Sequence, residues 1–184
     1  MKLVHINLNE GILVDAINCT EWVIESPEYF SEYVMELAGQ VEGKEGRFVL
    51  SDNEKEVDIS KNVELIFNIF ALDINERKLI SKLYMELEKL TADERFYVKT
   101  QEMKQYLQEY LLQLEQETDY ILDLADEIDF ASLFKAFGIK YEVLEENFLE
   151  RLVRYMRIVE RLLKKKLLYL LICEVIYQIS RLMN

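Results

Sequence analysis

Seven carboxylates lie within residues 115–129, close enough in sequence to bind one metal ion together. Carboxylate oxygens are ligands that calcium prefers, so a divalent cation site is one interpretation. The segment has neither the central glycine nor the terminal glutamate that an EF-hand loop places at fixed positions. A solvated acidic helix end is the alternative, because charge runs usually face water.

A glycine-containing segment, Gly-Gln-Val-Glu-Gly-Lys-Glu at residues 39–45, invites comparison with a phosphate-binding loop. Such a loop needs four residues between its glycines and a Ser or Thr after the lysine, so that backbone amides and a hydroxyl hold phosphate and magnesium. Here three residues separate Gly39 from Gly43, and Glu45 follows Lys44. Because the carboxylate would repel phosphate, the segment argues against nucleotide hydrolysis.

His5 is the only histidine, and it lies in a stretch with strand-like alternation. A single histidine excludes metal sites that need two, and a catalytic triad would depend on this one residue. We therefore expect His5 to be a half-buried strand residue.

A basic run covers residues 151–166, where seven of sixteen residues are Arg or Lys, although the chain carries 35 acidic and 22 basic residues and a net charge of −13. Arg154, Arg157, Arg161 and Lys165 have the three-and-four spacing of one helix face. This face could contact DNA, an anionic membrane or the chain's own acidic residues, and internal salt bridges are as reasonable as phosphate contacts. The net charge argues that any DNA binding uses a local basic patch.

Targeting signals are not evident in the sequence. The N-terminus lacks the apolar region of a signal peptide, and the apolar run 167–173 is far shorter than the roughly 20 residues of a membrane span. Cys19 and Cys173 are distant in sequence and do not form a disulfide framework. These features predict a cytoplasmic protein without a membrane segment.

The elements that position these residues are mostly helical, because five glycines and one proline leave long uninterrupted stretches. Alternation predicts two or three short strands within residues 2–24 and another at 47–50. Ser26 and Pro27 mark the start of a helix that ends near Gly39. Apolar spacing predicts further helices at 61–72, 76–90, 92–117, 129–138 and 145–165, the second and third of them as an antiparallel hairpin, and strands at 139–144 and 167–172.

Three ordered stretches carry a resemblance to a known family: LIFNIFALDINERKLISKLYMELEKL (65–90), SLFKAFGIKYE (132–142) and ERLLKKKLLYLLI (160–172). They resemble the ring-forming accessory protein of type II-A CRISPR systems, over roughly residues 55–171 and more weakly before that. The family has no catalytic motif, so short matches in the same helix and strand order carry the resemblance.

The resemblance implies an α+β, mixed α/β fold: a small, mostly parallel-sheet head of residues 1–72 with 167–184, and a long α-helical leg of residues 73–166. It implies a non-catalytic homotetrameric ring that holds double-stranded DNA without sequence preference during spacer acquisition, beside the CRISPR integrase proteins and the effector nuclease. Family members continue with further strands and a helix past the last matched stretch. The head is therefore expected to be completed differently here, or covered by a neighbouring chain.

The resemblance also implies site residues. DNA-facing lysines are expected at Lys55, Lys61 and Lys135. Charge and expected exposure add Lys44 and Arg47 from the turn-rich segment 39–60. Family members bind calcium through acidic leg residues, which implies the ligands Asp119, Asp123, Asp126 and Glu127.

Two other functions stay open at this point. The chain could be a divalent-cation-dependent nucleotide-handling enzyme that uses residues 39–45 and the acidic segment. It could also be a structural helical protein that binds no nucleic acid and whose basic face neutralises its own acidic leg.

Overall fold

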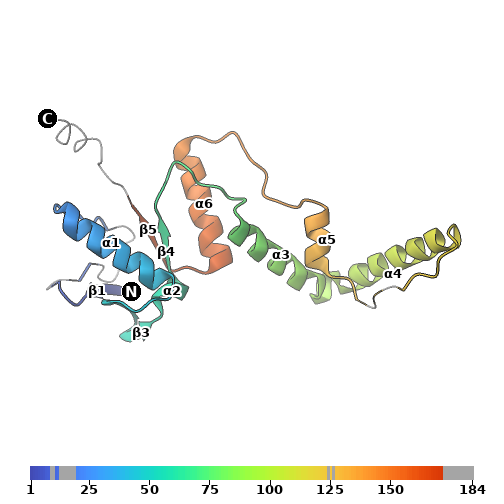
Figure 1. Ribbon diagram of the computed structural model, residues 1–184, viewed down its shortest axis with the longest axis horizontal. Coiled ribbons are helices and arrows are strands. Elements are labelled where there is room, and N and C mark those ends of the chain that lie inside the picture. The colour runs from blue at the N-terminus through green and yellow to red at the C-terminus, as the bar shows by residue number, and fades with distance from the viewer. Residues whose placement is uncertain (9–10, 13–19, 124, 126, 172–184) are drawn as a thin grey trace. The chain divides into compact units, whose positions relative to one another are not determined.

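The computed structural model of this protein describes residues 1–8, 11–12, 20–123, 125 and 127–171 (Figure 1). A mixed α and β composition, as the sequence predicts, is confirmed in this part of the chain. The elements are β1 (Lys2–His5), α1 (Pro27–Val41), β2 (Phe48–Asp52), β3 (Lys55–Val57), α2 (Ile59–Asn62), β4 (Val63–Ile66), α3 (Arg77–Thr91), α4 (Glu94–Gln116), α5 (Phe130–Ala136), α6 (Phe148–Leu163) and β5 (Leu167–Leu170).

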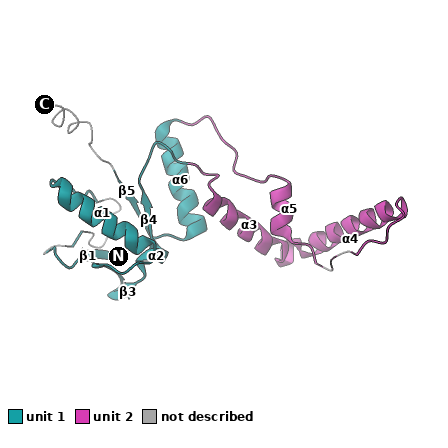
Figure 2. Cartoon of the chain, viewed as in Figure 1, with its two compact units in different colours: residues 1–72, 147–184 teal, residues 73–146 magenta. Residues whose placement is uncertain are grey.

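The chain divides into two compact units, shown in different colours in Figure 2. Residues 1–72 and 147–184 form the first, called the head, and residues 73–146 form the second, called the leg. The sequence placed α6 in the leg, whereas its contacts group it with the head. The physical reason is that α6 buries Tyr155, Val159 and Leu162 and leads directly into β5, which pairs with β4.

Two small sheets make up the strand part of the head. β1, β2 and β3 pair antiparallel in that order, with Leu3 opposite Leu50 and Leu50 opposite Val57. β4 and β5 pair parallel, with Val63 opposite Leu167. The expected mostly parallel sheet is therefore correct only for β4 and β5. The connection from β2 to β3 is a tight turn, which permits only antiparallel pairing, whereas the whole leg and α6 separate β4 from β5.

A single apolar cluster joins α1 to the antiparallel sheet. Tyr33 and Leu37 of α1 pack with residues of β1, β2, α2 and β4, and Trp22 lies against the cluster. The predicted start of α1 is confirmed, since the Ser26 side chain accepts a hydrogen bond from the Tyr29 amide and Pro27 is the first helical residue. The helix continues through Gly39 to Val41. The buried members of the cluster are Leu3, Tyr33, Leu37, Phe48, Leu50, Ile59 and Val63.

The structure differs from the predicted elements at three places. The helix expected over 61–72 is one turn, α2, followed by β4, because burial of Val63 and pairing with β5 outweigh helix propensity. Residues 139–144 form no strand. Of the strands expected within 2–24, β1 is present and residues 20–24 are not in a strand, while 9–10 and 13–19, with Cys19, lie outside the described residues, as does Cys173.

The leg has a small core. Ile74, Leu79 and Phe130 are its buried apolar residues in the described ranges. α5 packs on α3, where the Tyr84 hydroxyl donates to the Ile139 carbonyl at 2.8 Å. The expected antiparallel pair of α3 and α4 is not formed: α4 buries no residue and extends away from α3 in Figure 1. α5 takes the place on α3 that the sequence assigned to α4.

Two hydrogen bonds of the Asn75 side chain join the beginning and the end of the leg, and we call them the Asn75 clasp. The Asn75 side chain donates to the Tyr141 carbonyl at 3.0 Å and accepts from the Tyr141 amide at 2.8 Å. These two bonds reproduce the exchange of a hydrogen-bonded residue pair in an antiparallel ladder. The clasp ties the chain entering the leg to the chain leaving it.

Candidate nucleic-acid interface

Lysines on β3, on α2 and in the connection from α6 to β5 lie on segments of the head that contact one another. Lys55 is on β3, paired in register with Asp52 of β2, and the Asp52 carboxylate contacts Lys166 Nζ at 2.7 Å. Lys61 is on α2, where the preceding residue, Ser60, offers its carbonyl to Lys165 Nζ at 2.5 Å. We call Lys55, Lys61, Lys164, Lys165 and Lys166 the lysine cluster.

The members of the lysine cluster differ in how they are held. Lys166 pairs with Asp52, whose pKa this hydrogen bond lowers, and Lys165 is tied to backbone. Lys61 lies 3.4 Å from Asp58 but its side chain is 80% exposed. Lys55 and Lys164 are exposed, and no ion pair involves them within the described residues. Lys165 and Lys166 are therefore anchored, although Lys166 is still 51% exposed, whereas Lys55, Lys61 and Lys164 are exposed and less constrained.

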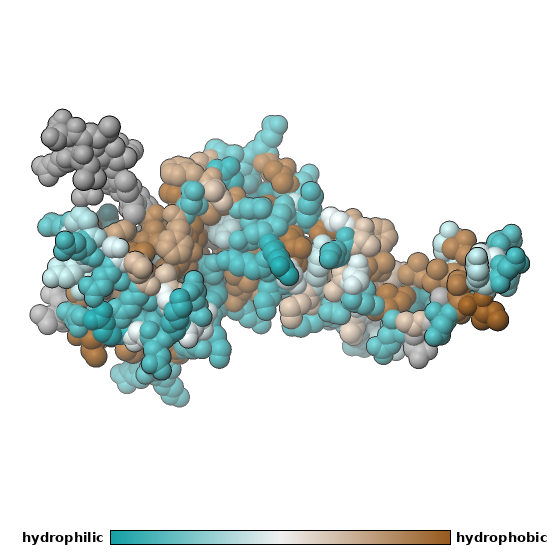
Figure 3. All heavy atoms as spheres, in the orientation of Figure 1, coloured by the Kyte–Doolittle hydropathy of each residue, from teal (hydrophilic) through white to brown (hydrophobic). Residues whose placement is uncertain are grey.

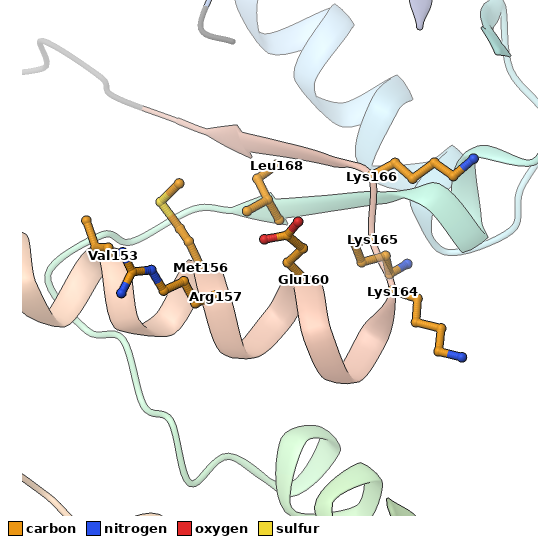
Figure 4. A pocket seen from close by; sticks show the side chains of 8 residues that line it. All are labelled: Val153, Met156, Arg157, Glu160, Lys164, Lys165, Lys166 and Leu168. Carbon is orange, nitrogen blue, oxygen red and sulfur yellow. The ribbon is translucent and has the colours of Figure 1, made fainter. Parts of the chain in front are cut away.

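A cavity of about 620 Å³ adjoins the lysine cluster, between α6 and β5 (Figure 4). Four cationic side chains and one carboxylate line it, beside an apolar wall. The sequence showed the basic run on α6 without indicating a cavity, because its shape depends on where β5 pairs. Its lining residues are Val153, Met156, Arg157, Glu160, Lys164, Lys165, Lys166 and Leu168.

Arg47 is held within the head by two carboxylates. Its Nη2 atom lies 2.7 Å from Glu36 and 2.8 Å from Glu32, and these hydrogen bonds raise the pKa of Arg47. The same bonds lower the pKa of Glu36 to about 2. Lys44, also predicted to face DNA, pairs with Glu42 at 2.9 Å on the surface. A phosphate would have to compete with these carboxylates at both positions.

His5 lies buried beneath this ion pair. Its Nδ1 atom accepts from the Asn7 amide at 3.2 Å, so its Nε2 atom carries the hydrogen and faces Glu36 at 3.3 Å. The ring packs against Tyr33 and Phe48, with centroids 4.8 and 4.5 Å away. His5 is thus a fully buried core residue with both ring nitrogens engaged.

The Glu36 network predicts acid sensitivity of the head. Because the folded pKa lies below the ordinary value of 4.5, Glu36 stabilises the fold above pH 4.5 and loses that contribution as pH falls toward 2. Glu36→Gln should therefore lower the free energy of unfolding by about 1–3 kcal/mol at pH 7, allowing for the half-exposed Arg47. Urea titrations at several pH values should show the difference between wild type and variant shrinking from pH 4.5 downward and nearly gone at pH 2. A difference that persisted at pH 2 would assign the effect to packing instead of charge.

Residues 39–45 do not form a phosphate-binding loop. Gly39 ends up inside α1, and residues 42–47 connect that helix to β2. A phosphate-binding loop has the reverse order, strand then helix, so that the helix amides point at the phosphate. Carboxylates of Glu56 and Asp58 line the cavity of about 560 Å³ beside this connection. Residues 39–45 therefore do not provide the phosphate-binding motif on which the nucleotide-handling hypothesis depends.

The leg carries the remaining predicted site residues. Lys135 is exposed on α5, and Asp119, Asp123 and Glu127 are exposed in the connection from α4 to α5, while Asp126 lies outside the described residues. Asp129 instead caps α5, accepting from the Ser132 amide at 3.1 Å. No three metal-binding side chains gather within the described ranges. The calcium site stays a prediction.

Among the residues that the structure describes, no helix has the length and hydropathy required to cross a bilayer.

Comparison with known proteins identifies a family. The family model described as CRISPR-associated protein (Cas_Csn2) matches residues 40–181, which contain the whole leg, α6 and the lysine cluster. No curated protein matches the chain.

Proposed function

This chain belongs to the Cas_Csn2 family of CRISPR-associated proteins of type II-A systems, and from this premise we propose that it is a non-catalytic binding protein for double-stranded DNA. It acts as a homotetrameric ring in spacer acquisition, without sequence preference. The CRISPR integrase proteins and the effector nuclease are its proposed partners.

The lysine cluster is the observation that supports DNA binding. A chain with a net charge of −13 repels phosphate on average, so a local concentration of cations is required. Lys55 and Lys61, proposed from the sequence, are exposed, as is Lys164, and the contacts of Lys166 with Asp52 and of Lys165 with Ser60 join the segments that carry them. The cavity next to them adds Arg157. Contacts of this kind bind the phosphate backbone and read no base sequence.

The apolar face of α4 supports assembly with further copies of the chain. Phe96, Tyr106, Tyr110 and Leu114 follow helical spacing and are 43–73% exposed. Figure 3 shows apolar residues reaching the surface along the leg. An apolar stripe of this length on a helix that buries nothing is unusual for a monomer. In the proposed ring, the same face of a second copy covers it.

Light scattering with and without a short linear duplex tests the assembly directly. The proposal requires the mass of four chains, and binding that prefers linear duplex over closed circles, because a ring must be threaded by a free end. A monomer indifferent to DNA would instead support the structural helical protein. Equal binding to linear and closed circular DNA would remove the threaded ring and leave surface binding.

Calcium is proposed as a ligand of the assembled protein. The described carboxylates do not gather as a site, so ligands must also come from Asp126 or a second chain. Calcium at one hundred times its dissociation constant should stabilise the fold by about 2.7 kcal/mol, and magnesium should stabilise it less. Melting scans with calcium, magnesium or chelator measure this. In Asp123→Asn/Asp126→Asn the calcium response should vanish, and an unchanged response would leave the segment as a solvated acidic face.

A further inference from the structure

We propose that the cavity between α6 and β5 binds a phosphomonoester, the group at a phosphorylated DNA end, with Arg157 and Lys164, which extend from opposite ends of the cavity in Figure 4, turning inward to contact the phosphate. This assignment rests on the proposed DNA binding and names one contact site within it. It differs from contact along the duplex backbone, which needs only an exposed basic surface.

The shape and charge of the cavity favour a terminal phosphate. About 620 Å³ lies within the 300–1,000 Å³ range typical of small-molecule sites. A phosphomonoester carries a charge of about −1.5 to −2 at pH 7, against −1 for a backbone phosphate. Four cations line the cavity with one carboxylate, Glu160, and although Lys166 is paired with Asp52 the lining keeps a net positive charge, which suits the more highly charged group.

The apolar wall points to the rest of the ligand. Val153, Met156 and Leu168 offer no donor to a phosphate, but they can pack against a sugar or a base. Figure 4 shows Val153 and Met156 along α6 beside Arg157, and Leu168 on β5 facing that helix. The cavity thus offers both cationic and apolar contacts, as a terminal nucleotide requires.

The backbone of Lys164 supplies a second, independent observation. Lys164 ends α6 in the left-handed conformation, with φ 55° and ψ 31°, at a position where glycine is the usual residue. Attraction between a lysine side chain and the negative end of the helix dipole does not explain why lysine occupies this left-handed position, because a lysine elsewhere in the last turn would make the same favourable interaction. Strain of this kind concentrates at functional sites. Position 164 is thus a lysine although glycine would adopt the same backbone conformation without strain.

The neighbouring lysines hold this strained position in place. Lys165 Nζ donates to the Ser60 carbonyl, and the Lys166 amide donates to the Asn62 carbonyl at 2.9 Å. Lys166 Nζ is in turn paired with Asp52. Lys166 is also exposed, so Arg157 and Lys164 are distinguished as the exposed cations of the lining that have no ion pair among the described residues.

Fluorescence polarisation with two duplexes tests the proposal. The duplexes have the same sequence and differ only in a 5′-phosphate or a 5′-hydroxyl at each end. Wild type should bind the phosphorylated duplex about tenfold more tightly, the effect of roughly one net hydrogen bond to a charged group. Competition by AMP distinguishes the two sources of a phosphomonoester, a DNA end and a free nucleotide.

Two variants address the contact residues. Arg157→Gln and Lys164→Gly should each bring the preference for the phosphorylated duplex close to one. Lys164→Gly should do so while the melting temperature stays the same or rises, because glycine relaxes the backbone. A lysine with a purely structural role would lower the melting temperature and leave the preference unchanged.

Matched controls separate charge from strain. Arg161→Gln removes an exposed cation of α6 that does not line the cavity, so it should weaken the binding of both duplexes equally. Glu54→Gly relaxes another left-handed residue, φ 63° in the turn between β2 and β3, and should leave the preference intact.

Three outcomes overturn the assignment in different ways. Equal affinity of wild type for both duplexes removes the terminal-phosphate site but leaves DNA binding in place. AMP binding that Arg157→Gln abolishes, without any preference between the duplexes, assigns the cavity to free nucleotides. Failure to bind either duplex defeats the proposed function itself.

Discussion

Replacing Lys55, Lys61 and Lys164 together with glutamine is expected to lower the affinity for linear duplex on the order of a hundredfold at physiological salt. Each exposed lysine that neutralises a phosphate releases about one counterion, so three lost contacts should reduce the slope of log affinity against log salt by about three. Binding titrations at four salt concentrations measure both quantities. Lys165 and Lys166 are left in place because they connect α6 and β5 to the rest of the head.

A control with the same change in charge uses the leg. The exposed lysines of the leg include Lys82, Lys89 and Lys99. Replacing these three with glutamine should reduce the affinity for DNA only slightly, through the more negative net charge of the chain. Lys135→Gln, made singly, reports whether α5 also contacts DNA. If the leg variant lost as much affinity and slope as the head variant, the lysine cluster would not be the interface.

Leu79→Ala is expected to destabilise the leg by about 2–5 kcal/mol, the cost of a large cavity at a fully buried leucine. Since only Ile74 and Phe130 are buried beside it in the described leg, little apolar burial remains to hold α3 and α5 together. Hydrogen exchange should show loss of protection at α3 and α5, with the head unaffected. The affinity of each chain for DNA should fall less than the affinity of the chains for one another.

The matching control for the leg is Leu114→Ala on α4. Leu114 is 43% exposed, so its removal should change the stability of an isolated chain by less than about 1 kcal/mol. In the proposed ring it should weaken association, visible as a lower mass on dilution. An unaltered assembly would show that this face of α4 is not between copies.

The sequence predicted best what is local. The start of α1 follows from Ser26 and Pro27, and α6 follows from its apolar spacing, because caps and periodicity act within a few residues. β4 was read as helix, since its partner β5 lies about a hundred residues away and no local signal announces that pairing. The antiparallel pairing of β1, β2 and β3 was not predicted either, because the head was expected to hold a mostly parallel sheet.

In the candidate site, too, some residues could be predicted from the sequence and others depend on contacts between distant segments. Lys55 and Lys61 came from the resemblance, and the structure adds Lys164, Lys165 and Lys166 through contacts with Asp52 and Ser60. Arg47 looked available by charge alone, but Glu36, eleven residues earlier, becomes its neighbour only when α1 packs on β2. Charge in a sequence gives the number of cations, and the fold decides which of them remain open to a ligand.

The Asn75 clasp also bears on how such a chain can diversify. The leg leaves and rejoins the chain at two points joined by a single side-chain amide, so it is an insertion whose ends already lie together. Insertions of this geometry can be lengthened, shortened or exchanged between relatives without disturbing the host fold, since the closure cost changes slowly with length. Both hydrogen bonds lie within residues 73–146, so a leg moved to another scaffold would bring its own closure with it.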